Sequence, residues 1–228
     1  MTFLITGAGR GIGFELTQFA LEHKNEVFAM VRDPNKSRSL ATAQKEYPDR
    51  LHIVKGDVTD PASLTAAHEF IGNRPIDILI NNAGVLLDDE ESLTQLHGDK
   101  LALTFKVNAM GPLSVTQTFL PNLLKIKSSK LILMTSMMGS IADNRSGGYY
   151  AYRMSKAALN MFAKSFSIDY PMITTMLLHP GWVRTDMGGP QAPLLPRESA
   201  RALYQIIINA IPNMNGRFFD YQGKELPW

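Results

Sequence analysis

The two residues of this sequence best suited to move a proton are Tyr152 and Lys156, which stand four positions apart in a segment with helical periodicity. That spacing places both side chains on one face of a helix, about one turn apart. A free phenol ionises at about pH 10, whereas proton transfer at neutral pH works best at a pKa of about 7, and closing that gap takes about 4 kcal/mol. A nearby ammonium shielded from water can supply part of this free energy. Ordinary half-buried helical pairs share the spacing, so the pattern alone leaves both interpretations open.

Ser136 is a second candidate, because it comes just after the apolar run that ends at Met134 and is therefore expected where a strand ends. Its hydroxyl is suited to hydrogen-bonding a substrate oxygen, although a serine in this position also commonly forms a turn. A hydrolase nucleophile is disfavoured, since neither a Gly-x-Ser-x-Gly elbow nor a nearby histidine accompanies Ser136. The histidines are scattered without ligand spacing, so the sequence predicts no catalytic metal. They are His23, His52, His68, His97 and His179.

A glycine-rich turn, residues 6–13, follows the apolar run Phe3-Leu4-Ile5 and reads Thr-Gly-Ala-Gly-Arg-Gly-Ile-Gly. Its glycines let the backbone approach a ligand that a Cβ would exclude. A helix that begins after such a turn presents free N–H groups and a partial positive charge, which suit a pyrophosphate. The spacing T-G-x-x-x-G-x-G differs from the common G-x-G-x-x-G fingerprint. The turn therefore predicts a nucleotide site, with a purely structural loop as the alternative.

Alternating strands and helices must position these residues. Apolar runs predict strands at 3–5, 26–31, 51–54, 76–80, 131–134 and 173–178, and 217–219 would add a seventh. Helical periodicity predicts helices at 11–23, 98–126, 150–168 and 197–210, another opened by Pro61, and a kink at Gly111-Pro112. This alternation requires crossover connections. The predicted fold is α/β: a single doubly wound Rossmann-type domain over residues 1–228, with a mostly parallel sheet of six to seven strands and helices on both faces.

The composition is that of an ordinary soluble protein, with 45% hydrophobic and 19% charged residues in a chain of 228. Because 23 Lys and Arg stand against 21 Asp and Glu and no basic tract is present, nucleic acid is not expected as a partner. The absence of cysteine excludes disulfides and thiolate chemistry and is compatible with a reducing compartment. Without a leader-like start or an apolar run of membrane-spanning length, the chain is predicted to be cytoplasmic and not to enter membranes.

Taken together, these motifs resemble the classical short-chain dehydrogenase/reductase family over nearly the whole chain. The glycine turn, Asp57-Val58, Asn81-Asn82-Ala83-Gly84, Asn108, Ser136, Tyr152-x-x-x-Lys156 and Pro180-Gly181 with Thr185 follow the family's order at close to its spacings. Residues 179–189 and the ending 216–228 are more narrowly similar to the C-factor (C-signal) and sniffer-type carbonyl reductase branch.

The resemblance implies a role for each matching residue. Tyr152 would be the general acid, Lys156 would lower its pKa and hold the nicotinamide ribose, Ser136 would orient the carbonyl, and Asn108 would support a water between the lysine and solvent. The interval from Ser136 to Tyr152 is a few residues longer than in most members, which leaves the pocket shape open. The implied cofactor-binding residues are Gly7, Arg10, Gly11, Ile12, Arg32, Asp57, Val58, Asn82, Ala83, Gly84, Asn108, Tyr152, Lys156, Val183 and Thr185.

The charges near the second predicted strand favour NADP(H) over NAD(H). NAD-dependent members carry an acidic residue where this chain has Val31, and Arg32 follows it. Together with Arg10 in the glycine turn, this gives two guanidinium groups suited to bidentate bonds with a 2′-phosphate. Asp33 adds a nearby negative charge that counts against this interpretation.

The predicted activity is NADPH-dependent reduction of an aldehyde or ketone, with tolerance of several apolar substrates. Met137, Met138, Trp182 and Met187 would line the pocket, and the loop 186–196 would act as a lid. The main alternative is a cofactor-binding sensor or signalling protein of the C-factor type. An epimerase or dehydratase of the extended type is disfavoured by the chain length and the glycine spacing. The resemblance also implies a homodimer or homotetramer, associated through the helices predicted at 98–126 and 150–168.

Overall fold

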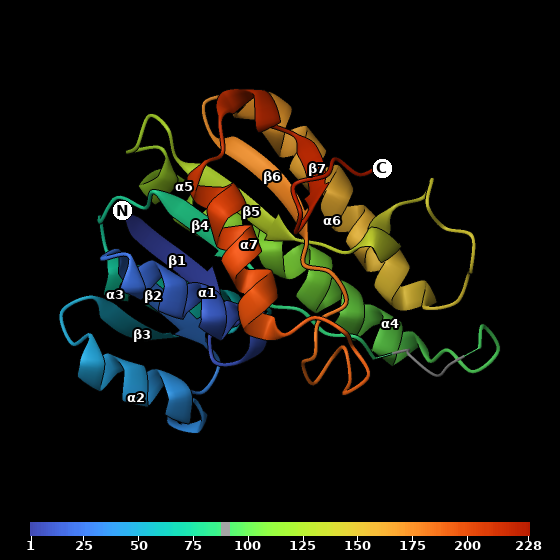
Figure 1. Cartoon of the computed structure of the whole chain (residues 1–228), viewed down its shortest axis with the longest axis horizontal. Helices are drawn as coiled ribbons and strands as arrows, with labels where there is room; N and C mark the ends of the chain where they lie inside the picture. Colours follow the sequence, from blue (N-terminus) through green and yellow to red (C-terminus); the bar gives the residue numbers. More distant parts are fainter. Residues whose placement is uncertain (88–91) are drawn as a thin grey trace.

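The structure, a computed structural model, describes residues 1–87 and 92–228 and is built on one central sheet (Figure 1). Seven strands follow the order β3-β2-β1-β4-β5-β6-β7, and every neighbouring pair is parallel. The predicted α/β fold with six to seven mostly parallel strands is therefore confirmed. The strands are β1 (Thr2–Thr6), β2 (Glu26–Val31), β3 (Leu51–Lys55), β4 (Ile78–Asn81), β5 (Lys130–Met134), β6 (Thr174–His179) and β7 (Arg217–Asp220).

Helices cover both faces of the sheet, as the alternating pattern predicts. One face carries α1 (Gly11–Glu22), α2 (Arg38–Glu46) and α7 (Pro196–Ile208), with α1 and α7 side by side in Figure 1. The opposite face carries α3 (Pro61–Ile71), α5 (Gly111–Leu123) and α6 (Tyr150–Asp169), while α4 (Gly98–Phe105) packs against α6. The 3-10 turns are η1 (Pro34–Lys36), η3 (Met137–Gly139) and η4 (Pro212–Met214).

The strands are buried on both sides, which is why they read as continuous apolar runs in the sequence. In β1, Phe3 and Ile5 contribute to the core under α1 and α7, whereas Leu4 contributes to the core under α3, α5 and α6. Burying one such side chain stabilises the fold by about 1.5–3 kcal/mol. Two cores of this kind hold the sheet firmly, so residues at its carboxyl edge have a rigid support.

The helix predicted at 98–126 differs in detail from the observed one. It consists of α4, a π-helical turn η2 (Lys106–Met110) and α5, and it ends at Leu123. The N–H of Gly111 donates to the carbonyl of Lys106, five residues earlier, so the interruption is an inserted residue rather than a proline kink. Pro112 lies in the first turn of α5, where its missing N–H costs little.

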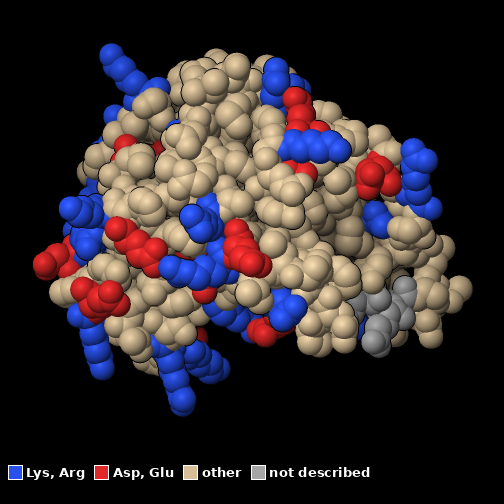
Figure 2. Space-filling model, viewed as in Figure 1, with Lys and Arg blue, Asp and Glu red and all other residues tan. Residues whose placement is uncertain are grey.

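Two features are absent from the described residues. Across residues 1–87 and 92–228, no helix has both the length and the apolar character needed to cross a bilayer. Nor do His, Cys, Asp and Glu side chains in these ranges gather in groups of three that would hold a metal ion. Figure 2 shows basic and acidic side chains interspersed on the face that it presents.

Candidate active site

The predicted site residues gather at one edge of the molecule because all seven strands are parallel and end on the same side. Strands β2 and β3 lie on one side of β1, and β4 lies on its other side. The strand order therefore reverses between β1 and β4. Predicted site residues follow strands β1 to β6: Gly7–Ile12 come after β1, Arg32 after β2, Asp57 and Val58 after β3, and Asn82–Gly84 after β4. Ser136 follows β5, and Val183 and Thr185 follow β6. The helices supply the rest, with Asn108 in η2 and Tyr152 and Lys156 on α6.

The glycine turn forms a backbone cradle that is packed tightly from the protein side. Gly7 has φ +64°, and a Cβ on Gly13 would lie 2.4 Å from the carbonyl oxygen of Gly7 and 2.5 Å from Asn82 Nδ2. Thr6 Oγ1 accepts hydrogen bonds from the backbone N–H groups of Asn82 (3.0 Å) and Ala83 (3.1 Å). The turn is therefore fixed against the end of β4.

The N-terminus of α1 has the properties that an anionic group requires. Its N-cap residue, Arg10, is extended and makes no side-chain hydrogen bond to the first turn of the helix. The free N–H groups and the partial positive charge of the helix end are thus available to a phosphate. Because the cradle excludes side chains and ends at an uncapped helix, the residues present fit a dinucleotide.

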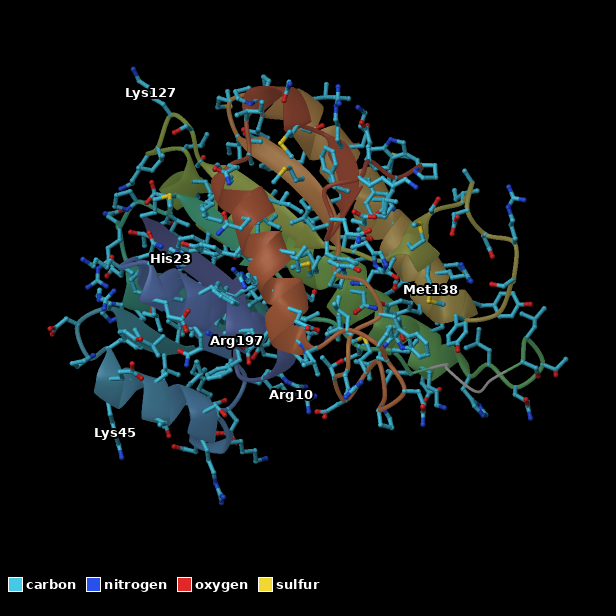
Figure 3. All side chains as sticks on the ribbon, in the orientation of Figure 1. Arg10, His23, Lys45, Lys127, Met138 and Arg197 are labelled. Atoms are coloured by element: carbon cyan, nitrogen blue, oxygen red, sulfur yellow. The ribbon has the colours of Figure 1, made fainter. Side chains whose placement is uncertain are left out.

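Polar groups border the outer side of the glycine turn. Arg32 is exposed immediately after β2. A Cβ on Gly9 would lie 2.8 Å from Ser37 Oγ, so this hydroxyl reaches the turn, although no sequence motif marks it. Arg10 lies at the N-terminal end of α1 (Figure 3), and its guanidinium pairs with the carboxylate of Asp186. From the sequence, Arg10 is expected to be available to a 2′-phosphate. In the structure, its guanidinium is paired with a residue of the loop after β6.

Tyr152 and Lys156 lie close together, as their spacing predicts, and Ser136 lies beside Tyr152. Tyr152 and Lys156 are only 7% and 5% exposed, and Lys156 Nζ lies 5.6 Å from the centroid of the Tyr152 ring. The Ser136 hydroxyl lies close enough to the Tyr152 phenol to lower its pKa. The phenol also lies 3.9 Å from the sulfur of Met187, a residue predicted to line the pocket. The three side chains therefore form one buried cluster.

The pKa of Tyr152 differs from the expectation. Burial raises the pKa of the phenol to about 12, and the neighbouring Ser136 hydroxyl opposes this only in part. Burial also lowers the pKa of Lys156 to about 8. The lysine loses water together with the tyrosine, and its Nζ donates to the carbonyl of Met134 (2.9 Å) rather than to the phenol. In this structure the phenol consequently keeps its proton at neutral pH.

Asn108 occupies the π-helical turn and is fully buried. Its Oδ1 accepts from the N–H of Val85 (2.8 Å), and its Nδ2 donates to the carbonyl of Val85 (2.8 Å) and to Ser155 Oγ (3.1 Å). Ser155 Oγ in turn donates to the carbonyl of Tyr152 (2.8 Å). The side chain of Asn108 thus connects the loop after β4 to the helix of Tyr152. Sequence analysis missed Ser155, although a hydroxyl three residues after Tyr152 is a detectable signal.

The remaining predicted residues complete the edge of the site. Asp57 Oδ1 accepts from the N–H and the hydroxyl of Thr59, both at 2.8 Å, which fixes the turn after β3. Val58 is buried close to Gly111. A Cβ on Gly11 would lie 3.3 Å from Thr185 Cγ2, so the loop after β6 reaches the glycine turn.

Comparison with known proteins identifies the family. A profile of the short chain dehydrogenase family matches residues 1–193. The chain belongs to this family. C-signal from Myxococcus xanthus is 50% identical over 160 residues, covering 68% of this chain and 93% of C-signal. The NADPH-bound carbonyl reductase from chicken fatty liver is 34% identical, with a TM-score of 0.94 over 100% of this chain and 98% of that one. The carbonyl reductase Sniffer of D. melanogaster is 32% identical, with a TM-score of 0.92 over 100% and 99%. The predicted resemblance to this branch is confirmed.

Proposed function

We propose that this short-chain dehydrogenase reduces an aldehyde or ketone to an alcohol with NADPH. The observation that carries the proposal is the buried cluster of Ser136, Tyr152 and Lys156 beside a glycine turn that fits a dinucleotide. Similar proteins of known structure support the choice of cofactor, since the chicken carbonyl reductase contains NADPH and one from Pseudomonas aeruginosa contains NADP. NAD(H) is the less favoured alternative.

Each residue of the cluster has a defined task in this reaction. When bound, NADPH would supply the hydride for this reduction. Ser136 Oγ holds the carbonyl oxygen beside Tyr152, and the Tyr152 phenol gives its proton to that oxygen. The ammonium of Lys156 stabilises the phenolate that remains, in a site where water is excluded. Asn108 fixes the helix of Tyr152 through Ser155 and would support the water that returns a proton.

The cofactor would be held along the carboxyl edge of the sheet. Gly7, Gly11 and Ile12 would receive the pyrophosphate at the start of α1, and Asp57 with Val58 would flank the adenine. Asn82, Ala83 and Gly84 would line the groove, Lys156 would hold the ribose, and Val183 with Thr185 would close over the carboxamide. Arg10 and Arg32 would bind the 2′-phosphate.

The direct test is NADPH consumption by the pure protein with a panel of apolar aldehydes, ketones and diketones. We expect turnover of several members of the panel, because methionines and Trp182 give a soft apolar lining. A protein that binds NADPH but oxidises it with no member of the panel would contradict the proposed reaction.

Changing Arg32 to glutamate is expected to reverse the cofactor preference. The guanidinium can form charge-assisted bonds with a 2′-phosphate, and losing them weakens NADPH binding by about ten- to one-hundred-fold. NADH binding should improve, because glutamate can accept a bond from the ribose 2′-hydroxyl. Titration of both cofactors measures this. Lys45→Gln is the control, since Lys45 lies exposed on α2 and extends into solvent (Figure 3). Equal or stronger NADH binding by the wild type would argue against NADP(H).

The second candidate is a cofactor-binding signalling protein, which the 50% identity to C-signal favours. The two functions differ in their need for the phenol of Tyr152. Full biological activity of Tyr152→Phe in cells, together with no detectable NADPH oxidation by the wild type, would favour signalling. Loss of both activities in the variant would favour the reductase.

We also propose a homodimer or homotetramer within the cytoplasm, formed from a single domain of residues 1–228. Strands from both ends of the chain belong to one sheet, which supports a single domain. Exposed apolar side chains on the helices expected at the interface support association. They are Leu103, Met110, Leu113 and Leu124 near α4 and α5, and Met154, Met161 and Ile168 on α6. Light scattering measures the mass, and a strictly monomeric protein would contradict the association.

A further inference from the structure

Arg153, the residue directly after Tyr152, holds the loop that connects Ser136 to Tyr152. Its Nε donates to the carbonyls of Gly147 (3.2 Å) and Gly148 (3.1 Å), and its Nη2 donates to Ser146 Oγ (2.9 Å). Its Nη1 donates to the carbonyl of Met138 (3.4 Å). One guanidinium therefore connects α6 both to the last residues of the loop and to the turn η3 at its start.

All four of these acceptors are neutral. Within residues 1–87 and 92–228, no carboxylate forms an ion pair with Arg153, which is partly buried at the start of α6. A hydrogen bond from a cation is about twice as strong as a neutral one. A planar guanidinium with several fixed donors also suits a set of diverging acceptors better than an ammonium does.

The loop needs such support because its backbone is unfavourable. Gly147, Gly148 and Tyr149 all have positive φ, at +66°, +64° and +51°. Tyr149 is a bulky residue in the left-handed region, which L-residues other than glycine rarely adopt. Tyr149 is also the N-cap of α6 and makes no side-chain hydrogen bond to the helix. The bonds from Arg153 hold the carbonyls of the two preceding residues and so stabilise this conformation.

The same guanidinium reaches the segment that carries Ser136. Ser136 Oγ accepts from the N–H of Met138 (3.1 Å), and the carbonyl of Met138 accepts from Arg153. Met138 lies beside α6 (Figure 3), and a Cβ on Gly139 would lie 2.8 Å from Lys156 Cβ, so η3 packs directly against the helix. Arg153 therefore joins the residues next to Ser136 to the residue next to Tyr152.

We propose that Arg153 is a positioning residue that sets the separation of the Ser136 hydroxyl and the Tyr152 phenol by fixing the loop 141–149 between them. This inference rests on the proposed reductase function. In this role Arg153 neither contacts the substrate nor transfers a proton. It acts through η3 and the loop 141–149, the two segments that hold the reacting groups. Its effect should therefore appear in turnover rather than in cofactor binding.

Three variants test the proposal: Arg153→Met, Arg153→Lys and Arg145→Met. Small displacements of reacting groups cost up to about one-hundred-fold in rate, so Arg153→Met should lower kcat by about ten- to one-hundred-fold. NADPH affinity should not change. Arg153→Lys should recover part of kcat, since an ammonium can satisfy some of the four acceptors. Arg145→Met removes a positive charge from the same exposed loop without removing the connection, and should keep wild-type turnover.

Limited trypsin digestion reports on the loop independently of activity. Arg145 is exposed within the loop, and cleavage after it should be slow in the wild type and faster in Arg153→Met, whose loop is released. Arg145→Met should abolish this cleavage, which identifies the site. Faster cleavage with unchanged kcat would overturn the positioning role, and unchanged cleavage would overturn the connection itself. If the wild type reduces no carbonyl, the reductase proposal fails, and the cleavage pattern alone then decides whether Arg153 holds the loop.

Discussion

Replacing Tyr152 by phenylalanine should lower kcat for carbonyl reduction by about one-hundred- to ten-thousand-fold, the range for loss of a general acid. Burial raises the pKa of this phenol to about 12, so across neutral pH it carries the proton that reduction consumes. Phenylalanine keeps the buried ring, hence the fold and NADPH binding should persist. Steady-state turnover and cofactor titration on the same preparation measure both effects.

Tyr150→Phe is the matched control, because Tyr150 lies two residues earlier on the same helix and is 37% exposed. Its turnover should equal that of the wild type. If Tyr152→Phe retains kcat within about ten-fold of the wild type, less than the loss expected for a general acid, Tyr152 does not have this role. The reaction would then need another proton donor.

Replacing Lys156 by methionine should change activity and stability in opposite directions. Removing the buried ammonium deprives the phenolate of a nearby positive charge, and kcat should fall by about one-hundred-fold or more. The same substitution removes a charge that the fold has to bury. Because burial lowers the pKa of Lys156 from 10.5 to about 8, burying the protonated lysine destabilises the folded state at neutral pH. The cost is about 3 kcal/mol.

The expected gain in the free energy of unfolding is smaller than this cost. Lys156 Nζ donates to the carbonyl of Met134, and losing that bond offsets about 1 kcal/mol. The variant should therefore be more stable by about 2 kcal/mol at neutral pH, which raises Tm by about 4–8 °C for a chain of this size. Urea and thermal unfolding measure the difference.

The pH dependence has a definite sign. Below pH 8 the lysine is protonated in both the folded and the unfolded protein, so the wild type bears the full cost of burying the charge. Between pH 8 and 10.5 the folded state loses the proton first, and the cost disappears. The advantage of Lys156→Met should therefore be largest at neutral pH and shrink toward pH 10.5. A variant less stable than the wild type at neutral pH would show that the lysine is not buried as a charge.

Much of the architecture could be predicted from the sequence because the strands are buried on both faces and read as apolar runs. The runs at 26–31, 131–134 and 217–219 coincide with β2, β5 and β7 to within one residue. The strand predicted at 76–80 begins later, at Ile78. Ile76 is buried, but its N–H donates to the carbonyl of Asn122 outside the sheet, which apolar character alone does not reveal.

The proximity of the candidate site residues could be predicted, but their electrostatics could not. Spacing places Lys156 one turn from Tyr152 and so predicts their proximity. It does not indicate how completely the fold excludes water from these two side chains, and this desolvation determines the direction of both pKa shifts. The pairing of Arg10 with Asp186 was also unpredictable, because these residues are 176 positions apart and belong to two loops.

The extra residue in η2 lets one nearly continuous helix serve two different surfaces. Each residue of an α-helix advances by about 100°, so the insertion changes the angular phase of α5 relative to α4 by about that amount. As a result, α4 packs against α6, while Val115, Phe119 and Leu123 of α5 enter the core beneath α3. Deleting one residue between Lys106 and Met110 would restore a single phase and rotate those three side chains toward solvent. The irregular turn at Asn108 is thus a requirement of helix packing as well as of the site.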